Sequence, residues 1–415
     1  MSNIKLFSFL ILICFGCSSN KILKDQTGKN DLTKRANRLA QENIIVDGHI
    51  DLPYRLKVRN FRLEKEYIGI PVESEEGDFD FVRARKGGLD APFMSIYIPS
   101  RHQKEGGAKA LADTLINMVE YIANENPDKF MVAKNPADVE TAYNAGMVAL
   151  PMGMENGAGI EDDLANIAYF DQRGISYITL THSKDNLICD SSYDTTHTWN
   201  GLSEFGEEVV MEMNRVGIMV DISHVSDSAF YDVLEMVDLP VIASHSSARK
   251  FVPGFERNMS DDMIKEMGIN GGVIMVNFGS TFLDGNIQKE RDKRREDLMG
   301  ILEENGVTRK SEEGKFLIAK FEKDNPNIFS DVKKVADHID LIVKLAGIDH
   351  VGFGSDYDGV GDSLPTGLKD VSDYPNLLKE LLQRGYSDQD ISKICYKNLF
   401  RVWNEVEDYA LNSKS

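Results

Sequence analysis

The sequence lacks the features of several protein classes. Only four cysteines occur in 415 residues: Cys14 and Cys17 lie at the end of the apolar N-terminal run, and Cys189 and Cys395 are far apart in sequence. Outside that run no CxxC pair occurs, which argues against a thiolate metal site or a CxxC redox centre in the rest of the chain. An excess of positive charge is also missing, since 67 acidic residues against 47 basic ones give a net charge of -20. Such a chain repels nucleic acids and anionic membrane surfaces, so neither is expected as a partner. No glycine-rich phosphate loop follows the first strand-like run, which disfavours a nucleotide-binding open sheet.

The N-terminus is an apolar run that follows Lys5 and ends at Gly16-Cys17. It is too short to span a bilayer as a mature helix but has the length of a signal peptide. Because polar residues follow at once, the segment is similar to a bacterial lipoprotein signal, in which the cysteine becomes the lipidated first residue. We expect residues 1–17 to be this signal and residues 18–39 a polar tether. The protein would then be extracytoplasmic, in the periplasm or at the cell surface, and held on the membrane only by a lipid anchor; an ordinary cleaved signal is the alternative.

Residues 40–408 are interpreted as one domain, because no low-complexity tract or proline-glycine linker interrupts them. Its cysteines, Cys189 and Cys395, are expected to be buried thiols, although their spacing does not decide whether they pair. Eight strand-like apolar runs follow one another: Ile44–Val46, Phe93–Ile98, Met147–Met152, Ser176–Leu180, Gly217–Ile222, Pro240–Ala243, Gly272–Asn277 and His350–Phe353. Helical patterns follow most of them, which predicts a (β/α)8 TIM barrel. A charged segment from Ser280 to Asn327 is predicted to be a helical insertion between strands seven and eight.

Imidazoles and carboxylates end six of the eight runs. In a barrel of this kind, the chemistry takes place at the C-terminal ends of the strands. The residues at these ends are His49 and Asp51, Glu155, His182, His224, His245, and Asp356 and Asp358. The first two are two positions apart on a strand and therefore point to the same side. Nitrogen and oxygen ligands without cysteine suit zinc or a similar divalent metal.

Glu155 is the candidate bridge of a two-metal site, because a carboxylate can use both oxygens to hold two ions about 3.5–4 Å apart. In strand order it lies between His49 with Asp51 and His224 with His245. The other four histidines fall in loops, within a helix or at the entry end of a strand, and we expect them to be structural: His102, His197, His338 and His350.

Taken together, these residues resemble the membrane (renal) dipeptidases, zinc metallopeptidases of the amidohydrolase-like barrel group. The resemblance covers residues 40–405 and rests on the following motifs: Asp47-Gly-His-Ile-Asp51, Gly153-Met-Glu155, Leu180-Thr-His182, Asp221-Ile-Ser-His224, Ser244-His-Ser-Ser-Ala248, Glu256-Arg-Asn258, Val276-Asn-Phe278 and Gly352-Phe-Gly-Ser-Asp-Tyr-Asp-Gly359. The chain departs from the family at Gly279, where a bulky aromatic residue is common, and before Asn398-Leu399, where a Gly-Gly pair is usual.

The resemblance implies a dipeptidase that holds two zinc ions and attacks the peptide bond with a hydroxide that bridges them. The implied ligands are His49, Asp51 and Glu155 for one ion, and Glu155, His224 and His245 for the other. Asp356 is implied as the proton carrier, His182 as a neighbour of the scissile carbonyl, and Arg257 as the partner of the free C-terminal carboxylate. Without the resemblance, a surface ion pair between Arg257 and Glu256 is the simpler interpretation. Asp221 and Asp358 are candidates for orienting the ligands.

Two other functions stay open. The first is another amidohydrolase-like activity at the same metals, on a cyclic amide, a lactone or an N-acyl amino acid. Against a cyclic-amide hydrolase, no lysine ends a strand where a carbamylated bridge would be expected. The second is a non-catalytic peptide-binding lipoprotein, which predicts lost ligands, and none is lost. The oligomeric state is not encoded in these motifs, and a homodimer is left open.

Overall fold

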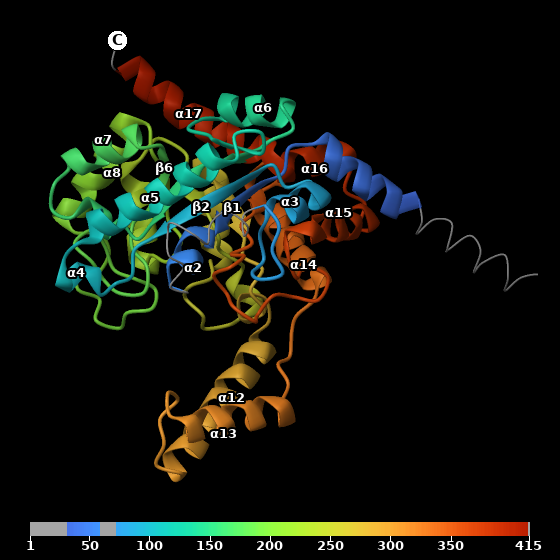
Figure 1. The fold of residues 1–415 in the computed structure, drawn as a ribbon. Coiled ribbons are helices and arrows are strands. Elements are labelled where there is room, and N and C mark those ends of the chain that lie inside the picture. Colours follow the sequence, from blue (N-terminus) through green and yellow to red (C-terminus); the bar gives the residue numbers. More distant parts are fainter. Residues whose placement is uncertain (1–30, 59–71, 414–415) are drawn as a thin grey trace, which may run out of the picture.

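The structure, a computed structural model, describes residues 31–58 and 72–413. A closed barrel of parallel strands forms its centre, and helices surround it (Figure 1). Around the barrel the strands are β1 (Val46–Ile50), β10 (Val351–Phe353), β9 (Val273–Val276), β8 (Ile242–Ala243), β7 (Met219–Asp221), β6 (Ile175–Thr179), β5 (Met152–Glu155) and β2 (Ala91–Tyr97). The predicted (β/α)8 barrel is confirmed.

The third apolar run forms two strands instead of one. β4 (Val148–Leu150) pairs with β3 (Phe130–Val132) in a separate two-stranded sheet, while β5 enters the barrel between β2 and β6. Pro151 separates the two strands, and because proline has no N–H it interrupts a hydrogen-bonded ladder. The predicted barrel strand Met147–Met152 is therefore wrong in its bounds. The barrel strand starts where that run ends, and Glu155 becomes its last residue.

Helices cover the outside of the barrel and fill the connections. Those around the barrel are α5 (Ala108–Glu125), α6 (Pro136–Asn144), α7 (Ala165–Gln172), α8 (Glu204–Val216), α9 (Asp227–Met236), α10 (Asp261–Asn270), α14 (Val332–Leu345), α15 (Tyr374–Gln383), α16 (Asp388–Ser392) and α17 (Asn398–Ser413). Shorter helices lie in the first two connections: α2 (Leu52–Val58), α3 (Phe81–Gly87) and α4 (His102–Glu105). Serine caps start several of them; the Ser226 side chain accepts a hydrogen bond from Ala229 N at the start of α9, as its position in the sequence predicts.

One helix extends beyond its predicted end. The sequence predicts that the helix beginning at Ser260 stops at Gly268, but α10 continues and is capped by Gly271 with a φ of 85°. At Gly268 a Cβ atom would approach the Cα of Ala346 to 2.9 Å, because α10 packs closely on α14. The first glycine therefore permits close helix packing, and the second supplies the left-handed cap.

Residues 31–42 form a helix that packs on the barrel domain. Leu39 and Ala40 of this helix are buried in the main hydrophobic core. The folded domain thus begins before residue 40, the start predicted from the sequence. The predicted signal peptide over residues 1–17 and Cys17 lie outside the described residues. Among residues 31–58 and 72–413, no helix combines the length and the apolar character needed to cross a membrane.

Aromatic side chains fill the interior of the barrel below the ends of the strands. The Phe93 ring of β2 lies 5.3 Å from the ring of Tyr177 and 5.1 Å from that of Trp403, which comes from α17. All three side chains are buried, and they belong to one hydrophobic cluster. Because this interior is packed, the C-terminal ends of the strands remain as the place for a site.

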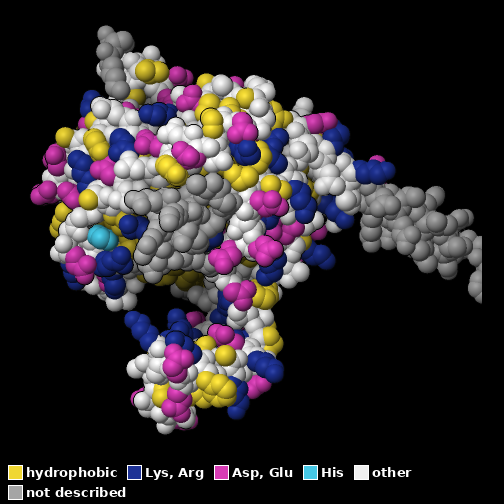
Figure 2. All heavy atoms as spheres, viewed as in Figure 1, with side chains coloured by type: hydrophobic (Ala, Val, Ile, Leu, Met, Phe, Trp, Pro, Cys, Tyr) yellow, Lys and Arg dark blue, Asp and Glu magenta, His cyan; other side chains and the backbone are white. Residues whose placement is uncertain are grey.

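The predicted insertion after β9 forms a helical arm, defined here as residues 280–327. It contains α11 (Ser280–Leu283), α12 (Gly285–Glu304) and α13 (Glu312–Asp324). Figures 1 and 2 show α12 and α13 standing away from the rounded barrel domain. The helical insertion is confirmed, and α11 joins it to the rim of the barrel.

Candidate metal centre

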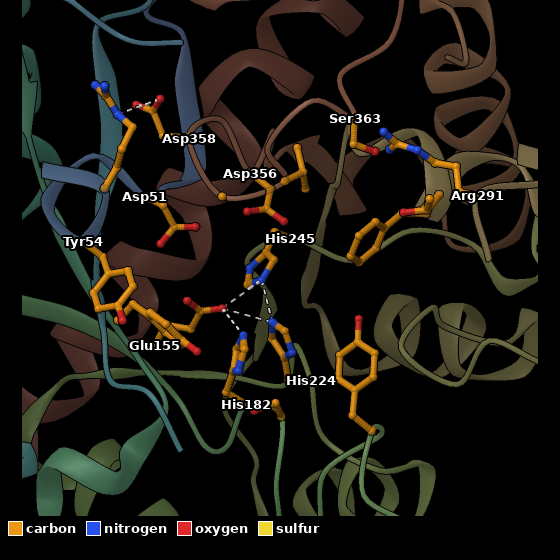
Figure 3. Close-up of a pocket in the computed structure, with 18 residues that line it drawn as sticks. Asp51, Tyr54, Glu155, His182, His224, His245, Arg291, Asp356, Asp358 and Ser363 are labelled. Carbon is orange, nitrogen blue, oxygen red and sulfur yellow. Dashed lines mark hydrogen bonds and ion pairs between the residues drawn. The ribbon is translucent and has the colours of Figure 1, made fainter. Parts of the chain in front are cut away.

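The predicted metal ligands lie together at the C-terminal end of the barrel. His49 and Glu155 belong to the ends of β1 and β5, and Asp51 follows β1 directly. His224 and His245 lie in the turns after β7 and β8. Parallel strands direct their C-terminal ends to one rim, so residues far apart in sequence meet there. Figure 3 shows His182, His224 and His245 pointing at Glu155.

Four imidazole nitrogens surround the Glu155 carboxylate. The Nε2 atoms near its Oε1 belong to three histidines: His182 at 3.5 Å, His224 at 3.0 Å and His245 at 3.3 Å. The Nε2 atom of His49 lies 3.5 Å from the other oxygen, Oε2, and 3.5 Å from Oδ2 of Asp51. The two oxygens of Glu155 thus face two different groups of ligand atoms, which is the geometry required of a carboxylate shared by two metal ions.

Two of these ligand atoms make no hydrogen bond to the described part of the chain. His49 Nε2 and Asp51 Oδ1 are buried, and neither has a hydrogen-bond partner among the described residues. The Nε2 atoms of His224 and His245 lie only 2.9 Å apart. Burial, with nearby positive charge, holds the pKa of both imidazoles well below the usual range, so both are neutral at pH 7 and can bind a cation. Imidazole and carboxylate atoms here form groups within 4.8 Å of one another, and these residues fit a divalent metal.

Two buried side chains, Asp47 and Tyr177, hold His49, and neither role was predicted from the sequence. Asp47 Oδ1 accepts a hydrogen bond from His49 N at 2.9 Å. The Tyr177 hydroxyl donates to Gly48 O at 2.9 Å and therefore accepts from His49 Nδ1 at 3.0 Å. This tautomer leaves the lone pair of Nε2 facing the cavity. A signal for Tyr177 was present in the sequence: it lies two residues before Thr179, so both side chains of β6 point to the same face, and Thr179 contacts Asp221 in the site.

Asp221 holds His245, the kind of role predicted for it from the sequence. Its Oδ1 accepts hydrogen bonds from the backbone of Ser223 and Ser244 at 3.0 and 2.8 Å. Its Oδ2 accepts from the hydroxyls of Thr179 and Ser244 at 2.5 and 2.6 Å. Ser244 Oγ lies in turn 2.7 Å from His245 Nδ1, so the chain of bonds directs Nε2 of the imidazole toward Glu155.

The pKa values of two buried carboxyl groups of the site, Glu155 and Asp356, are shifted in opposite directions. Burial opposes the ionisation of Glu155, but the surrounding imidazoles hold the pKa of Glu155 well below its usual range. Burial also raises the pKa of Asp356, and there the negative charges of Asp51 and Glu155 add to the effect, so that this pKa lies well above its usual range. Asn277, at the end of β9, donates to Asp356 Oδ2 at 2.8 Å. Asp356 is therefore suited to carry a proton near neutral pH.

The turns that carry His224 and Asp356 have left-handed backbones, with φ of 71° and 62°. Such a conformation costs a non-glycine residue about 1–3 kcal/mol and is common at functional sites. Hydrogen bonds hold both turns: Ser192 N donates to His224 O at 2.8 Å, and Asp356 N donates to His49 O at 3.1 Å.

Asp358 lines the cavity but contacts the first connection of the barrel instead of the ligands. Its Oδ1 lies 2.9 Å from Arg55 Nε and accepts a hydrogen bond from Asp78 N at 2.8 Å. Burial raises the pKa of Asp358 to about 7. It supports the rim and does not orient a metal ligand directly.

A cavity of about 780 Å³ lies over the site, and its wall includes Glu155, His182, His224, His245 and Asp356. The four remaining histidines lie outside it. His338, for example, joins two backbone groups. Ala248 N donates a hydrogen bond to its Nδ1 at 3.0 Å, and its Nε2 donates to Leu283 O at 3.0 Å.

Arg257 lies beneath this cavity and not on its wall. It is 3% exposed and donates to Ser246 Oγ and His245 O, both at 2.7 Å. Its Nε is buried without a hydrogen-bond partner among the described residues. A surface ion pair with Glu256 is not found in the described part of the chain, where Glu256 instead accepts from Asp227 N at 2.9 Å. The positive charge of Arg257 is close enough to help lower the pKa of His224.

Comparison with known families decides the identity of this barrel. The model of the membrane dipeptidase family, peptidase family M19, matches residues 33–415. The chain belongs to this family. As a membrane dipeptidase family member it is a metal-dependent dipeptidase, and the family expected from the sequence is confirmed.

Solved structures agree with this assignment. The probable dipeptidase PvdM from Pseudomonas aeruginosa is 25% identical, with a TM-score of 0.75, and the match covers 92% of this chain and 100% of that one. A metallopeptidase from Rhodobacter sphaeroides, bound to a phosphinate mimic of the dipeptide L-Ala-D-Ala, is 24% identical with a TM-score of 0.71 over 88% of this chain and 99% of that one. The second likeness shows the shared fold.

Proposed function

We propose that this member of the membrane dipeptidase family uses two zinc ions to hydrolyse dipeptides that carry a free C-terminal carboxylate. The observation that carries the proposal is the Glu155 carboxylate, with one oxygen near His49 and the other near His182, His224 and His245. The cavity of about 780 Å³ above it has room for a small substrate. The dipeptide mimic bound by the Rhodobacter sphaeroides metallopeptidase supports the substrate class.

The ligand atoms define where the ions would be held. One ion would bind His49, Asp51 and Glu155, and the other would bind Glu155, His224 and His245. Bound divalent ions polarise the scissile carbonyl and lower the pKa of a coordinated water to about 7. The unpartnered His49 Nε2 and Asp51 Oδ1 support this assignment, because buried polar atoms without partners are costly.

Asp356 is proposed to accept the proton of the attacking water and to deliver it to the leaving amine. It is near the proposed ligands, since its carboxylate oxygen falls in one group with atoms of His49 and Asp51. Its raised pKa makes the protonated form accessible at neutral pH, and the bond from Asn277 fixes its orientation.

His182 is proposed to stabilise the negative charge that develops on the carbonyl oxygen. Its Nε2 faces the cavity beside Glu155, and its ring lies 4.7 Å from the ring of Tyr97. Burial lowers the pKa of His182, so the ring is neutral and donates from one nitrogen only. Arg257 is proposed to attract the C-terminal carboxylate through its charge and its unpartnered Nε.

The decisive experiment compares a dipeptide with its C-terminal amide on the zinc-loaded protein. If Arg257 recognises the carboxylate, amidation costs about 2–5 kcal/mol of transition-state binding, which lowers kcat/KM by a factor of about 30 or more. N-acetyl amino acids in the same assay test the amidohydrolase-like alternative. Equal kcat/KM for acid and amide would contradict the dipeptidase proposal.

The lipid anchor on Cys17 and the extracytoplasmic location are proposals of the same kind. They are supported by the apolar run and the Gly16-Cys17 pair in the sequence. The helix over residues 31–42, which is the first described part of the chain, packs on the barrel domain.

A further inference from the structure

The arm supplies one wall of the cavity over the metal centre. Thr281 and Phe282 of α11 and Arg291 of α12 line this wall, together with Ser363 from the loop after β10. Figure 3 shows Arg291 beside Ser363, apart from the cluster of Glu155 and its histidines. The insertion therefore brings a positive charge into the substrate cavity.

Arg291 pairs with no carboxylate of the residues that the structure describes. Its Nη2 donates to the backbone oxygen of Asp362, and within the described ranges no carboxylate oxygen lies within 4.0 Å of its guanidinium nitrogens. The other charged groups near it are the cations Arg294 and Lys369, besides the Asp362 side chain. Burial lowers the pKa of Arg291, and the charge of Asp362 only partly offsets this effect. Arginine still remains charged at neutral pH.

Two other partly buried arginines of the domain, Arg249 and Arg384, do have such partners, whereas Arg401 donates only to backbone oxygens. Arg249 Nη2 lies 2.5 Å from Asp227 Oδ1, and Arg384 Nη1 lies 2.6 Å from Asp340 Oδ2. A partly desolvated guanidinium without an anion is unfavourable unless a ligand supplies one. In a substrate cavity, that ligand is a substrate group. Figure 2 shows Lys and Arg side chains at the end of the arm next to the barrel, with Asp and Glu side chains among them.

The position of Arg291 indicates which end of the substrate it meets. The Arg257 guanidinium carbon lies 5.6 Å from the centre of the Phe282 ring, and Phe282 lines the same cavity wall as Arg291. Arg257 therefore lies beneath the arm side of the cavity, whereas Arg291 is part of the wall itself. If Arg257 attracts the main-chain carboxylate of the C-terminal residue, a second anion near Arg291 belongs to the side chain of that same residue.

We propose that Arg291 binds a side-chain carboxylate of the substrate, so that the enzyme prefers dipeptides whose C-terminal residue is acidic. The inference rests on the proposed dipeptidase function and adds a substrate class to it. The planar guanidinium can pair with both oxygens of a carboxylate, whereas a side-chain amide offers one neutral oxygen and two N–H groups that face the cation unfavourably.

The test measures kcat/KM for Ala-Glu and Ala-Gln, each in its L,L and L,D form, on the zinc-loaded full-length protein. Glutamate and glutamine have the same shape, so the ratio of the two values reports the charge. The expected ratio exceeds about tenfold in the wild type and falls about tenfold or more in Arg291→Gln. Arg291→Lys, which keeps the charge without the planar fork, should retain part of the ratio.

Lys293→Gln is the matched control. It removes the same charge two residues further along α12, but Lys293 is exposed and does not line the cavity. Its ratio should equal that of the wild type, and thermal unfolding should show all variants folded.

Three results would overturn the inference. An unchanged ratio in Arg291→Gln would mean that Arg291 only joins the arm to the loop at Asp362. An equal loss on both dipeptides, with the ratio intact, would mean that it binds the main-chain carboxylate. No cleavage of any dipeptide by the wild type would instead refute the proposed function, and this inference with it.

Discussion

Replacing Glu155 by glutamine tests the centre of the proposed site with a minimal change of shape. Glutamine offers one neutral oxygen and an NH2 group in place of two anionic oxygens. Whichever way the amide turns, its nitrogen takes the place of an oxygen that lies 3.0 Å from His224 Nε2 or 3.5 Å from His49 Nε2. Its N–H groups then bond to imidazole lone pairs that the metal needs. Both proposed ions also lose the whole negative charge that they share through this carboxylate.

The expected loss follows from what a bound metal contributes. Metal-assisted attack and carbonyl polarisation are worth several kcal/mol, about 4–6, so kcat/KM should fall about 10³- to 10⁴-fold. At a zinc concentration about 100 times its Kd, each occupied site stabilises the fold by about 2.7 kcal/mol. The wild type should therefore gain about 5 kcal/mol from zinc, and Glu155→Gln about half of this or less.

Three measurements on the full-length protein check this prediction: metal content after gel filtration, kcat/KM on a simple dipeptide, and unfolding with zinc or with a chelator. Glu207→Gln is the control, because this residue is exposed on α8 and the charge change is the same. Two ions per chain together with wild-type turnover in Glu155→Gln would refute the bridging role. Loss of metal without loss of turnover would refute the metal-assisted reaction.

Two further predictions concern the residues that support the site. Asp221→Asn should lower the free energy of unfolding by about 1–3 kcal/mol and the zinc affinity by about 10- to 100-fold, because it weakens the hydrogen bonds that hold Ser244 and His245. Denaturant unfolding measures the first effect and zinc titration the second. An unchanged zinc affinity would contradict the orienting role of Asp221. Burial lowers the pKa of His338 to about 4 in the folded state, against about 6.5 for a histidine in an unfolded chain. His338 therefore binds a proton more readily when the chain is unfolded, and it destabilises the fold as the pH falls from about 6.5 toward 4. The wild type should lose up to about 3 kcal/mol in this window and His338→Gln much less, since glutamine can bond to Ala248 N and Leu283 O without titrating; equal urea denaturation midpoints at pH 4.5 and pH 7 for the wild type would refute this.

The strand ends were predictable because the (β/α)8 pattern repeats a local rule. Each apolar run is a buried strand, and the first polar residue after it lies on the common rim. His224 and His245 need no knowledge of their contacts to be placed there, and the structure brings both to Glu155. The bounds of the third strand were less predictable, since Pro151 divides one apolar run between two sheets.

Gly268 and Arg257 are two residues whose surroundings could not be predicted from the sequence around them. Gly268 has the sequence context of a helix stop, yet it lies inside α10 because Ala346 of another element packs against it. Arg257 is identified by its motif, but whether its guanidinium faces the cavity depends on Ser246 and the His245 carbonyl, which hold it beneath the wall. Contacts of this kind join elements that no sequence period relates.

The sequence by itself determined the barrel, the ligand types and their common rim, because strand period and strand order are local properties of the chain. Only the tertiary structure decided which buried polar atoms have no hydrogen-bond partner and which charged side chains lie close together. Tyr177 sets the tautomer of His49 from another strand, and Arg291 reaches the cavity because α12 begins next to the barrel rim. Such pairings depend on distances between side chains from separate elements, and these distances exist only once the whole domain has packed.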